Sequence, residues 1–189
     1  LSPHDALPIC PPPAAADELA ADPRETDDLG VPRTRVTAEA ATLGEPLDPA
    51  LVFIADPYSA RSDAFRTVRR KLAASGNPRV IGVTSAHAGE GKTTLACNLA
   101  LALREGARGR VLLVEANHRA PALAKILGIA PPPCFLEQLA RHVEDPRLAW
   151  VAAEPLPKLH VMTIDPKVKH APLLDPVAFA AGMERLKQA

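Results

Sequence analysis

The sequence has few of the residues that mark several classes of protein. Aromatic residues make up only 3% of the 189 residues, so a hydrophobic core must be built from Ala, Leu, Val and Ile. The cysteines Cys10, Cys97 and Cys134 follow no metal-ligand spacing and no disulfide pattern. The six histidines are scattered without an H-x-x-x-H pair, which argues against a metal site of that kind.

Neither a long apolar run nor an excess of one charge is present. No stretch approaches the roughly 18 apolar residues that a membrane helix needs. Lys plus Arg and Asp plus Glu both number 22, so the formal net charge is zero. We therefore expect no membrane span in this chain and no nucleic-acid partner. Unpaired cysteines are typical of a cytoplasmic protein with reduced thiols.

The first 50 residues have the composition of a linker. Residues 11 to about 46 are rich in Ala, Pro and acidic residues and show no sustained hydrophobic period. The chain begins with Leu, and residues 4–9 (HDALPI) translate a string that looks like the end of a common sequencing adapter. We expect residues 1–10 to be read-through and residues 1–50 to be disordered. The folded domain is expected over residues 51–189.

The stretch from residue 79 to residue 94, RVIGVTSAHAGEGKTT, carries the strongest motif in the chain. Residues 80–84 form an apolar run that is typical of a buried strand, and a helical pattern of leucines follows the stretch. Between them, residues 86–93 fit A-x-x-x-x-G-K-T, the Walker A pattern with Ala in place of its first Gly. This strand–loop–helix context predicts a phosphate-binding loop.

Each residue type in this loop suits phosphate chemistry. Gly89 and Gly91 leave the backbone unhindered, so successive N–H groups can curl around phosphate oxygens. Lys92 brings a cation to the β- and γ-phosphates, and the Thr93 hydroxyl can ligate Mg²⁺. The residues that we expect to bind nucleotide are Ala86, His87, Ala88, Gly89, Glu90, Gly91, Lys92, Thr93 and Thr94.

The remaining apolar patterns predict an α/β domain. A helix is expected from Ser59 or Ser62 to about residue 74, another over residues 93–105, and a second buried strand at Val111–Val114. Because a single helix joins the two strands, residues 80–84 and Val111–Val114 are predicted to be parallel neighbours. The result is a three-layer sandwich with a parallel sheet. Further expected elements are helices at 120–127, 135–142 and 176–188 and weaker strands at 148–152 and 159–164.

Glu115 directly follows the second predicted strand. The carboxyl ends of parallel strands are where open α/β sheets bind ligands. Glu115 is therefore a candidate for holding Mg²⁺ or its bound water, or for polarising an attacking hydroxyl. Lys92 and Glu115 are the predicted catalytic residues. The alternative is an acid that caps a turn.

Three runs together resemble the cytoplasmic domain of bacterial tyrosine autokinases: DAFRTVRRKL, VIGVTSAHAGEGKTTLACNLALAL and VLLVEANHRAP. That family lies within the MinD/ParA-like P-loop ATPases and acts with membrane chain-length regulators in capsule and exopolysaccharide export. The resemblance implies ATP and Mg²⁺ as cofactors, a homo-oligomer, and a place at the inner face of the membrane through that partner. The family's ring-assembly motif, E-x-x-R-x-x-R, is matched by Asp63, Arg66 and Arg69, with Asp in place of Glu. The alternative for these arginines is a solvated helix face.

The resemblance is uneven in its other motifs. Glu115 and Asn117 stand where the family's second motif has aspartates, and only Arg119 is kept. Asn117 lacks the charge and the proton-accepting capacity of an aspartate. No strand ending in D-x-x-P follows residues 176–188, and Tyr58 is the single tyrosine, so a tyrosine-rich tail is missing. We therefore expect a chain truncated before the Walker B motif.

Three functions stay open at this point. The first is an ATP-dependent tyrosine autokinase domain, or a degenerate relative, that regulates polysaccharide export. The second is a partitioning ATPase of the MinD/ParA type. Those proteins carry a lysine where this chain has His87, which favours the first function. The third is a nucleotide-binding scaffold that has lost phosphotransfer, which Glu115 and Asn117 favour.

Overall fold

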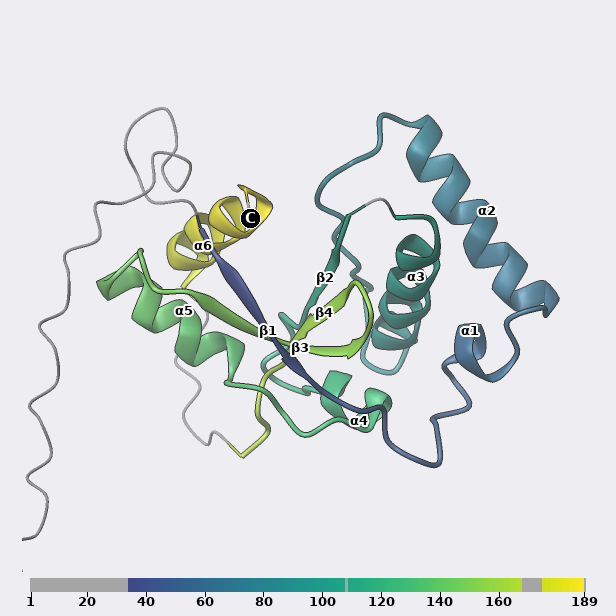
Figure 1. Ribbon diagram of the computed structural model, residues 1–189, viewed down its shortest axis with the longest axis horizontal. Helices are drawn as coiled ribbons and strands as arrows, with labels where there is room; N and C mark the ends of the chain where they lie inside the picture. Colours follow the sequence, from purple (N-terminus) through teal and green to yellow (C-terminus); the bar gives the residue numbers. More distant parts are fainter. Residues whose placement is uncertain (1–33, 108, 168–174, 189) are drawn as a thin grey trace, which may run out of the picture. The chain divides into compact units, whose positions relative to one another are not determined.

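The computed structural model describes residues 34–107, 109–167 and 175–188 (Figure 1). The expected read-through at residues 1–10 and most of the expected disordered tail lie outside these residues. In chain order the elements are β1 (Val36–Ala40), α1 (Val52–Ala55), α2 (Ala60–Ala74), α3 (Lys92–Gly106), β2 (Val111–Val114), α4 (Leu123–Leu127), α5 (Phe135–Glu144), β3 (Trp150–Leu156), β4 (Leu159–Met162) and α6 (Pro176–Gln188).

Four strands form one mostly parallel sheet in the order β1–β3–β4–β2. β1 pairs parallel with β3, and β2 pairs parallel with β4. β3 and β4 are antiparallel and follow each other directly in the chain. The prediction of an α/β fold is therefore confirmed. The sheet was predicted to be parallel and is mostly so, with an antiparallel pair, β3 and β4, at its centre.

Two hydrophobic cores cover opposite faces of the sheet. Because side chains alternate along a strand, Ala153 of β3 joins one core whereas Trp150 and Ala152 join the other. The first core is built mainly from α1, α3 and α4, and the second from α5 and α6. The sheet therefore lies between two helical layers.

The longer helices begin and end close to their expected positions. In α2, the side chain of Ser59 accepts a hydrogen bond from the Ser62 N–H, the N-terminal cap that the sequence predicts. α6 occupies the expected residues 176–188, whereas α4 is shorter than expected. Among the described residues, no helix is long and apolar enough to cross a membrane.

The strand expected at residues 80–84 is not formed. Val80 and Ile81 are exposed, by 50% and 36%, and no described strand pairs with this segment. A β-branched run becomes a strand only when a neighbouring strand supplies the other half of the hydrogen-bond ladder. The neighbour of β2 in the sheet is β4. The prediction that residues 80–84 and Val111–Val114 are parallel neighbours is therefore wrong.

β1 lies in a region where the sequence predicts no structure. Its residues, VTAEA, are mostly exposed, so they carry no buried stripe that a pattern could show. The strand is held by its ladder with β3, and the Thr37 hydroxyl adds a hydrogen bond of 3.0 Å to the Trp150 carbonyl oxygen. The folded part of the chain thus begins before the expected boundary at residue 51.

Candidate phosphate-binding site

The phosphate loop leads directly into α3, with Gly91 as the N-terminal cap. Gly89 and Gly91 both have a φ of 80°, in the left-handed region that other residues rarely adopt. A Cβ added to either would meet no atom within 4 Å, so the backbone conformation, and not crowding, requires glycine here. The first N–H groups of α3 lack partners within the helix and favour an anion.

The ammonium group of Lys92 is held by oxygens of the loop itself. Its Nζ donates hydrogen bonds of 2.7 Å to Ser85 Oγ and 2.7 Å to the His87 carbonyl oxygen. Both acceptors are neutral, whereas a phosphate would form a stronger, charge-assisted bond with the same ammonium. The lysine can therefore exchange these partners for a ligand.

Glu90 contacts the backbone and the side chain of His87 within the loop. Its Oε2 accepts the His87 N–H at 3.0 Å, and its Oε1 lies 3.3 Å from His87 Nδ1. The bond from the His87 N–H is the main cause that holds the pKa of Glu90 below its usual value, and Ser85 and Lys92 lower it further. A fixed carboxylate therefore lies within the loop that carries the lysine.

Glu115 is held by three backbone N–H groups from two other segments. It is 6% exposed, and its Oε1 accepts the N–H groups of Ala122 and Leu123 at 2.7 and 2.9 Å. Its Oε2 accepts the Ile164 N–H at 3.0 Å. These bonds join the end of β2 to the start of α4 and to the segment after β4. The three backbone donors thus satisfy the carboxyl oxygens without a cation.

Both predicted parts of the site border one open hollow of about 1740 Å³. Lys92 and Thr93 line it from the start of α3, and Glu115 and Asn117 line it from the end of β2. Asn117 is also part of a turn, in which its Nδ2 donates to the Ala120 carbonyl oxygen at 3.0 Å. The other expected loop residues, Ala86, His87, Ala88, Gly89, Glu90, Gly91 and Thr94, are not among the residues that line the hollow.

The described chain offers no ready-made metal site. Nowhere in its described ranges do three or more His, Cys, Asp or Glu side chains gather where they could hold an ion. Thr93 Oγ1 remains positioned at the start of α3, directly after Lys92.

The residues predicted for assembly gather around Glu105, at the other end of α3. Arg66 Nε donates to Glu105 Oε2 at 2.9 Å, and its Nη2 donates to Oε1 at 2.8 Å. Arg69 Nη1 donates to Oε2 at 2.9 Å, and Asp63 Oδ1 accepts from Arg66 Nη1 at 3.0 Å. The bonds from Arg66, and then those from Arg69, hold the pKa of Glu105 below its usual value. The sequence did not identify Glu105, because only the packing of α2 against α3 brings it to the arginines.

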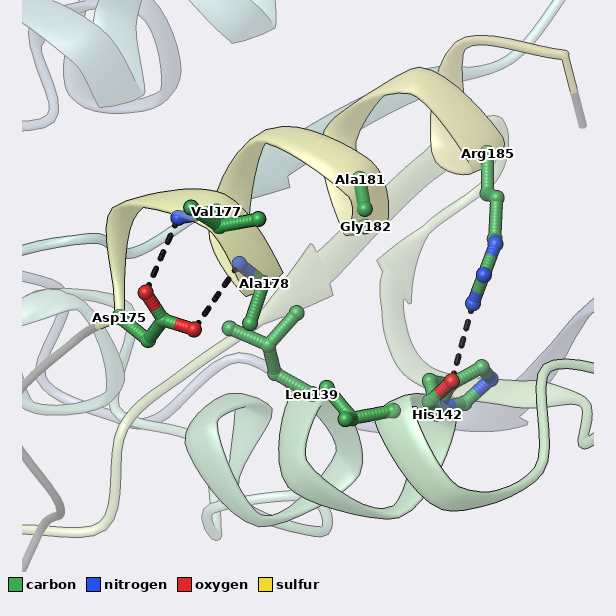
Figure 2. Close-up of a pocket in the computed structure, with 9 residues that line it drawn as sticks. Leu139, His142, Asp175, Val177, Ala178, Ala181, Gly182 and Arg185 are labelled. Atoms are coloured by element: carbon green, nitrogen blue, oxygen red, sulfur yellow. Dashed lines mark hydrogen bonds between the residues drawn. The ribbon is translucent and has the colours of Figure 1, made fainter.

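A second, smaller cavity of about 210 Å³ lies between α5 and α6 (Figure 2). Asp175 caps α6 by accepting the N–H groups of Val177 and Ala178 at 3.1 and 3.3 Å. Arg185 Nη1 donates to the His142 carbonyl oxygen at 3.0 Å and joins the two helices. The polar groups around this cavity thus serve the helices, and we assign it no ligand.

A comparison with known proteins found a solved structure that is similar in fold to this chain. No protein-family model matches this chain, and no curated protein matches it either. The crystal structure of a chimeric protein, CapA2B2, matches 84% of this chain with a TM-score of 0.56 and 24% sequence identity. The match covers 66% of the CapA2B2 chain, so this chain spans slightly less than two thirds of it. At this identity the likeness concerns the fold, and this chain shares the α/β fold of CapA2B2.

Proposed function

We propose that this chain is an ATP-binding domain of the bacterial tyrosine-autokinase type. It acts in the cytoplasm with a membrane chain-length regulator and regulates the synthesis and export of capsule or exopolysaccharide. The observation that carries the proposal is the phosphate loop, with Gly89 and Gly91 in left-handed conformations and Lys92 at the start of α3. The three sequence runs and the fold shared with CapA2B2 support it.

The loop residues fit the phosphates of a nucleotide. Lys92 is bonded to two neutral oxygens, and the N-terminal N–H groups of α3 lie beside it. Thr93 is the residue that would hold the Mg²⁺ that accompanies ATP, and this ion neutralises phosphate charge. This chain itself supplies the backbone N–H groups at the start of α3 and the ammonium group of Lys92.

Titration calorimetry with Mg-ATP and Mg-ADP tests nucleotide binding. We expect Lys92→Ala to weaken binding by about 30-fold or more, because a charge-assisted hydrogen bond contributes about 2 kcal/mol or more. Lys125→Ala is the matched control, because Lys125 is an exposed lysine on α4 that does not line the hollow. Equal affinities of the wild type and Lys92→Ala would exclude the loop from nucleotide binding.

A nucleotide-binding scaffold without phosphotransfer is the second candidate. The observation that favours it is Glu115, whose carboxylate is already bonded to three backbone N–H groups. Its test is phosphotyrosine formation with the membrane activator present, in the wild type and in the double variant Glu115→Asp, Asn117→Asp. Phosphotyrosine in either protein supports the kinase. Two silent proteins that still bind ATP support the scaffold.

We also propose that α2 takes part in a homo-oligomer through Asp63, Arg66 and Arg69. The support is the match to the family's assembly motif and the place of these residues at the end of α3, away from the phosphate loop. Sedimentation velocity of the full chain over a range of concentrations tests this proposal. A chain that stays monomeric with and without Mg-ATP would contradict it.

A further inference from the structure

The phosphate loop contains an anion of its own, the carboxylate of Glu90. One oxygen, Oε2, accepts the His87 N–H at 3.0 Å, and the other lies 3.3 Å from His87 Nδ1. The bond from the His87 N–H is the main cause that lowers the pKa of Glu90, and the Ser85 hydroxyl and the charge of Lys92 lower it further. A backbone N–H, a hydroxyl and an ammonium group of the loop therefore already stabilise a negative charge.

Ser85 and His87 connect this carboxylate to Lys92. Lys92 Nζ donates to Ser85 Oγ and to the His87 carbonyl oxygen, both at 2.7 Å. Ser85 Oγ lies 3.0 Å from the same carbonyl oxygen. His87 thus donates its N–H to Glu90 and accepts a bond from Lys92 through its carbonyl oxygen. The acid and the base of the loop are held on the same short stretch, close enough for their charges to interact.

The groups that stabilise the Glu90 carboxylate are of the kind that bind phosphate. Loop N–H groups and an ammonium group bind phosphate oxygens through charge-assisted hydrogen bonds. A carboxylate among these groups lowers the positive potential that attracts a phosphate. The Glu90 side chain is 44% exposed, and its partners Ser85, His87 and Lys92 belong to the same loop. A phosphate can therefore displace the carboxylate into solvent.

We propose that Glu90 is an internal competitor of the nucleotide phosphates and that it limits how tightly the loop holds a nucleotide. A phosphate that enters the loop takes over the donors of Glu90, and the carboxylate returns to them when the nucleotide leaves. The competition weakens binding and speeds release, because the donors regain a partner within the chain. The inference rests on the nucleotide binding proposed above and assigns to the same loop a residue that opposes this binding.

Calorimetry of the full chain with Mg-ATP and Mg-ADP, together with the rate at which a fluorescently labelled ADP dissociates, tests the competition. Glu90→Gln removes the charge but keeps an oxygen that can accept the His87 N–H. We expect this variant to bind both nucleotides about threefold more tightly at low salt and to release ADP more slowly by a similar factor. Because salt screens charges, the gain in affinity should shrink as the salt concentration rises.

Glu137→Gln is the matched control for the change in net charge. Glu137 is an exposed carboxylate on α5 and does not line the hollow. This variant should bind both nucleotides as the wild type does. An equal gain in Glu137→Gln and Glu90→Gln would overturn the proposal, because net charge and not the position of Glu90 would then be the cause.

Two further results would overturn the proposal but leave the phosphate loop as the nucleotide site. The first is a wild type that binds nucleotide and a Glu90→Gln variant that binds it no more tightly, as expected if Glu90 only shapes the loop. The second is a gain in Glu90→Gln that is the same at low and high salt. If neither protein binds Mg-ATP or Mg-ADP, the proposed function fails together with this inference.

Discussion

Lys92, at the end of the phosphate loop, and Glu115 border the same hollow. The loop and Glu115 are nevertheless held in opposite ways. The contacts of Lys92 and Glu90 run to Ser85 and His87, within a few residues along an exposed loop. Glu115 is buried and is bonded to N–H groups of three other residues, one of them 49 positions away. Exposed, local bonds can be exchanged for a ligand, whereas buried, distant bonds cannot be broken without leaving donors unpaired. The contacts of the loop are therefore suited to exchange for a ligand, whereas those of Glu115 stabilise the fold.

The largest effect that would sharpen this comparison is expected from Glu115→Ala. Three N–H groups, two of them in buried hydrogen bonds, would lose their acceptor, so the free energy of unfolding should fall by about 3–5 kcal/mol. Urea denaturation measures this change, and Lys92→Ala, the matched variant in the loop, should stay within about 0.5 kcal/mol of the wild type. A similar stability of Glu115→Ala and the wild type would break the comparison.

Glu115→Asp should have an intermediate effect on stability. Aspartate is shorter by one methylene, so its carboxylate cannot keep all three hydrogen bonds without a shift of the backbone. We expect a loss of about 1–2 kcal/mol in urea denaturation. The affinity for Mg-ATP, measured on the folded protein, should change less than in Lys92→Ala. A gain in stability would show that an aspartate at this position reaches the same donors.

Gly91→Ala probes the loop through its backbone. A left-handed conformation costs an alanine about 1–2 kcal/mol, so we expect Mg-ATP to bind about tenfold more weakly. Gly109→Ala is the matched control, because an added Cβ there also meets open space but its φ is not positive. If both variants bind Mg-ATP equally well, the left-handed turn is not needed for binding.

The smallest expected effect is the pH dependence of stability that comes from the hydrogen bonds of Glu105. Arg66 holds the pKa of Glu105 below its ordinary value of 4.5, so the folded state favours the charged carboxylate. The stabilisation is complete above that ordinary value and is lost as the pH falls through the lower pKa of the folded state. The difference in stability between the wild type and Glu105→Gln should therefore shrink on acidification. Denaturant titrations of both proteins over the acidic range measure it, and a difference that grows in acid would contradict the assignment.

Local patterns predicted much of the helical structure and the position of the loop. The Ser59 cap and the apolar stripe place α2, and the glycines with Lys92 place the start of α3, because these signals act within one or two helical turns. The sheet was predicted less well. Residues 80–84 and Val111–Val114 are similar apolar runs, yet only Val111–Val114 has a strand partner. A strand depends on a neighbour that its own residues do not specify.

In the candidate site, too, local sequence predicted some features and the tertiary structure decided others. The sequence by itself determined that a phosphate loop with Gly89, Gly91 and Lys92 leads into a helix, because glycine conformation and helix initiation depend on neighbouring residues. It also marked Glu115, Arg66 and Arg69 as residues of interest. Only the tertiary structure decided their partners. Glu115 meets Ile164, and the arginines meet Glu105, through the packing of elements far apart in the chain. A residue type restricts which bonds a side chain can form, but the fold decides which groups come within hydrogen-bonding distance.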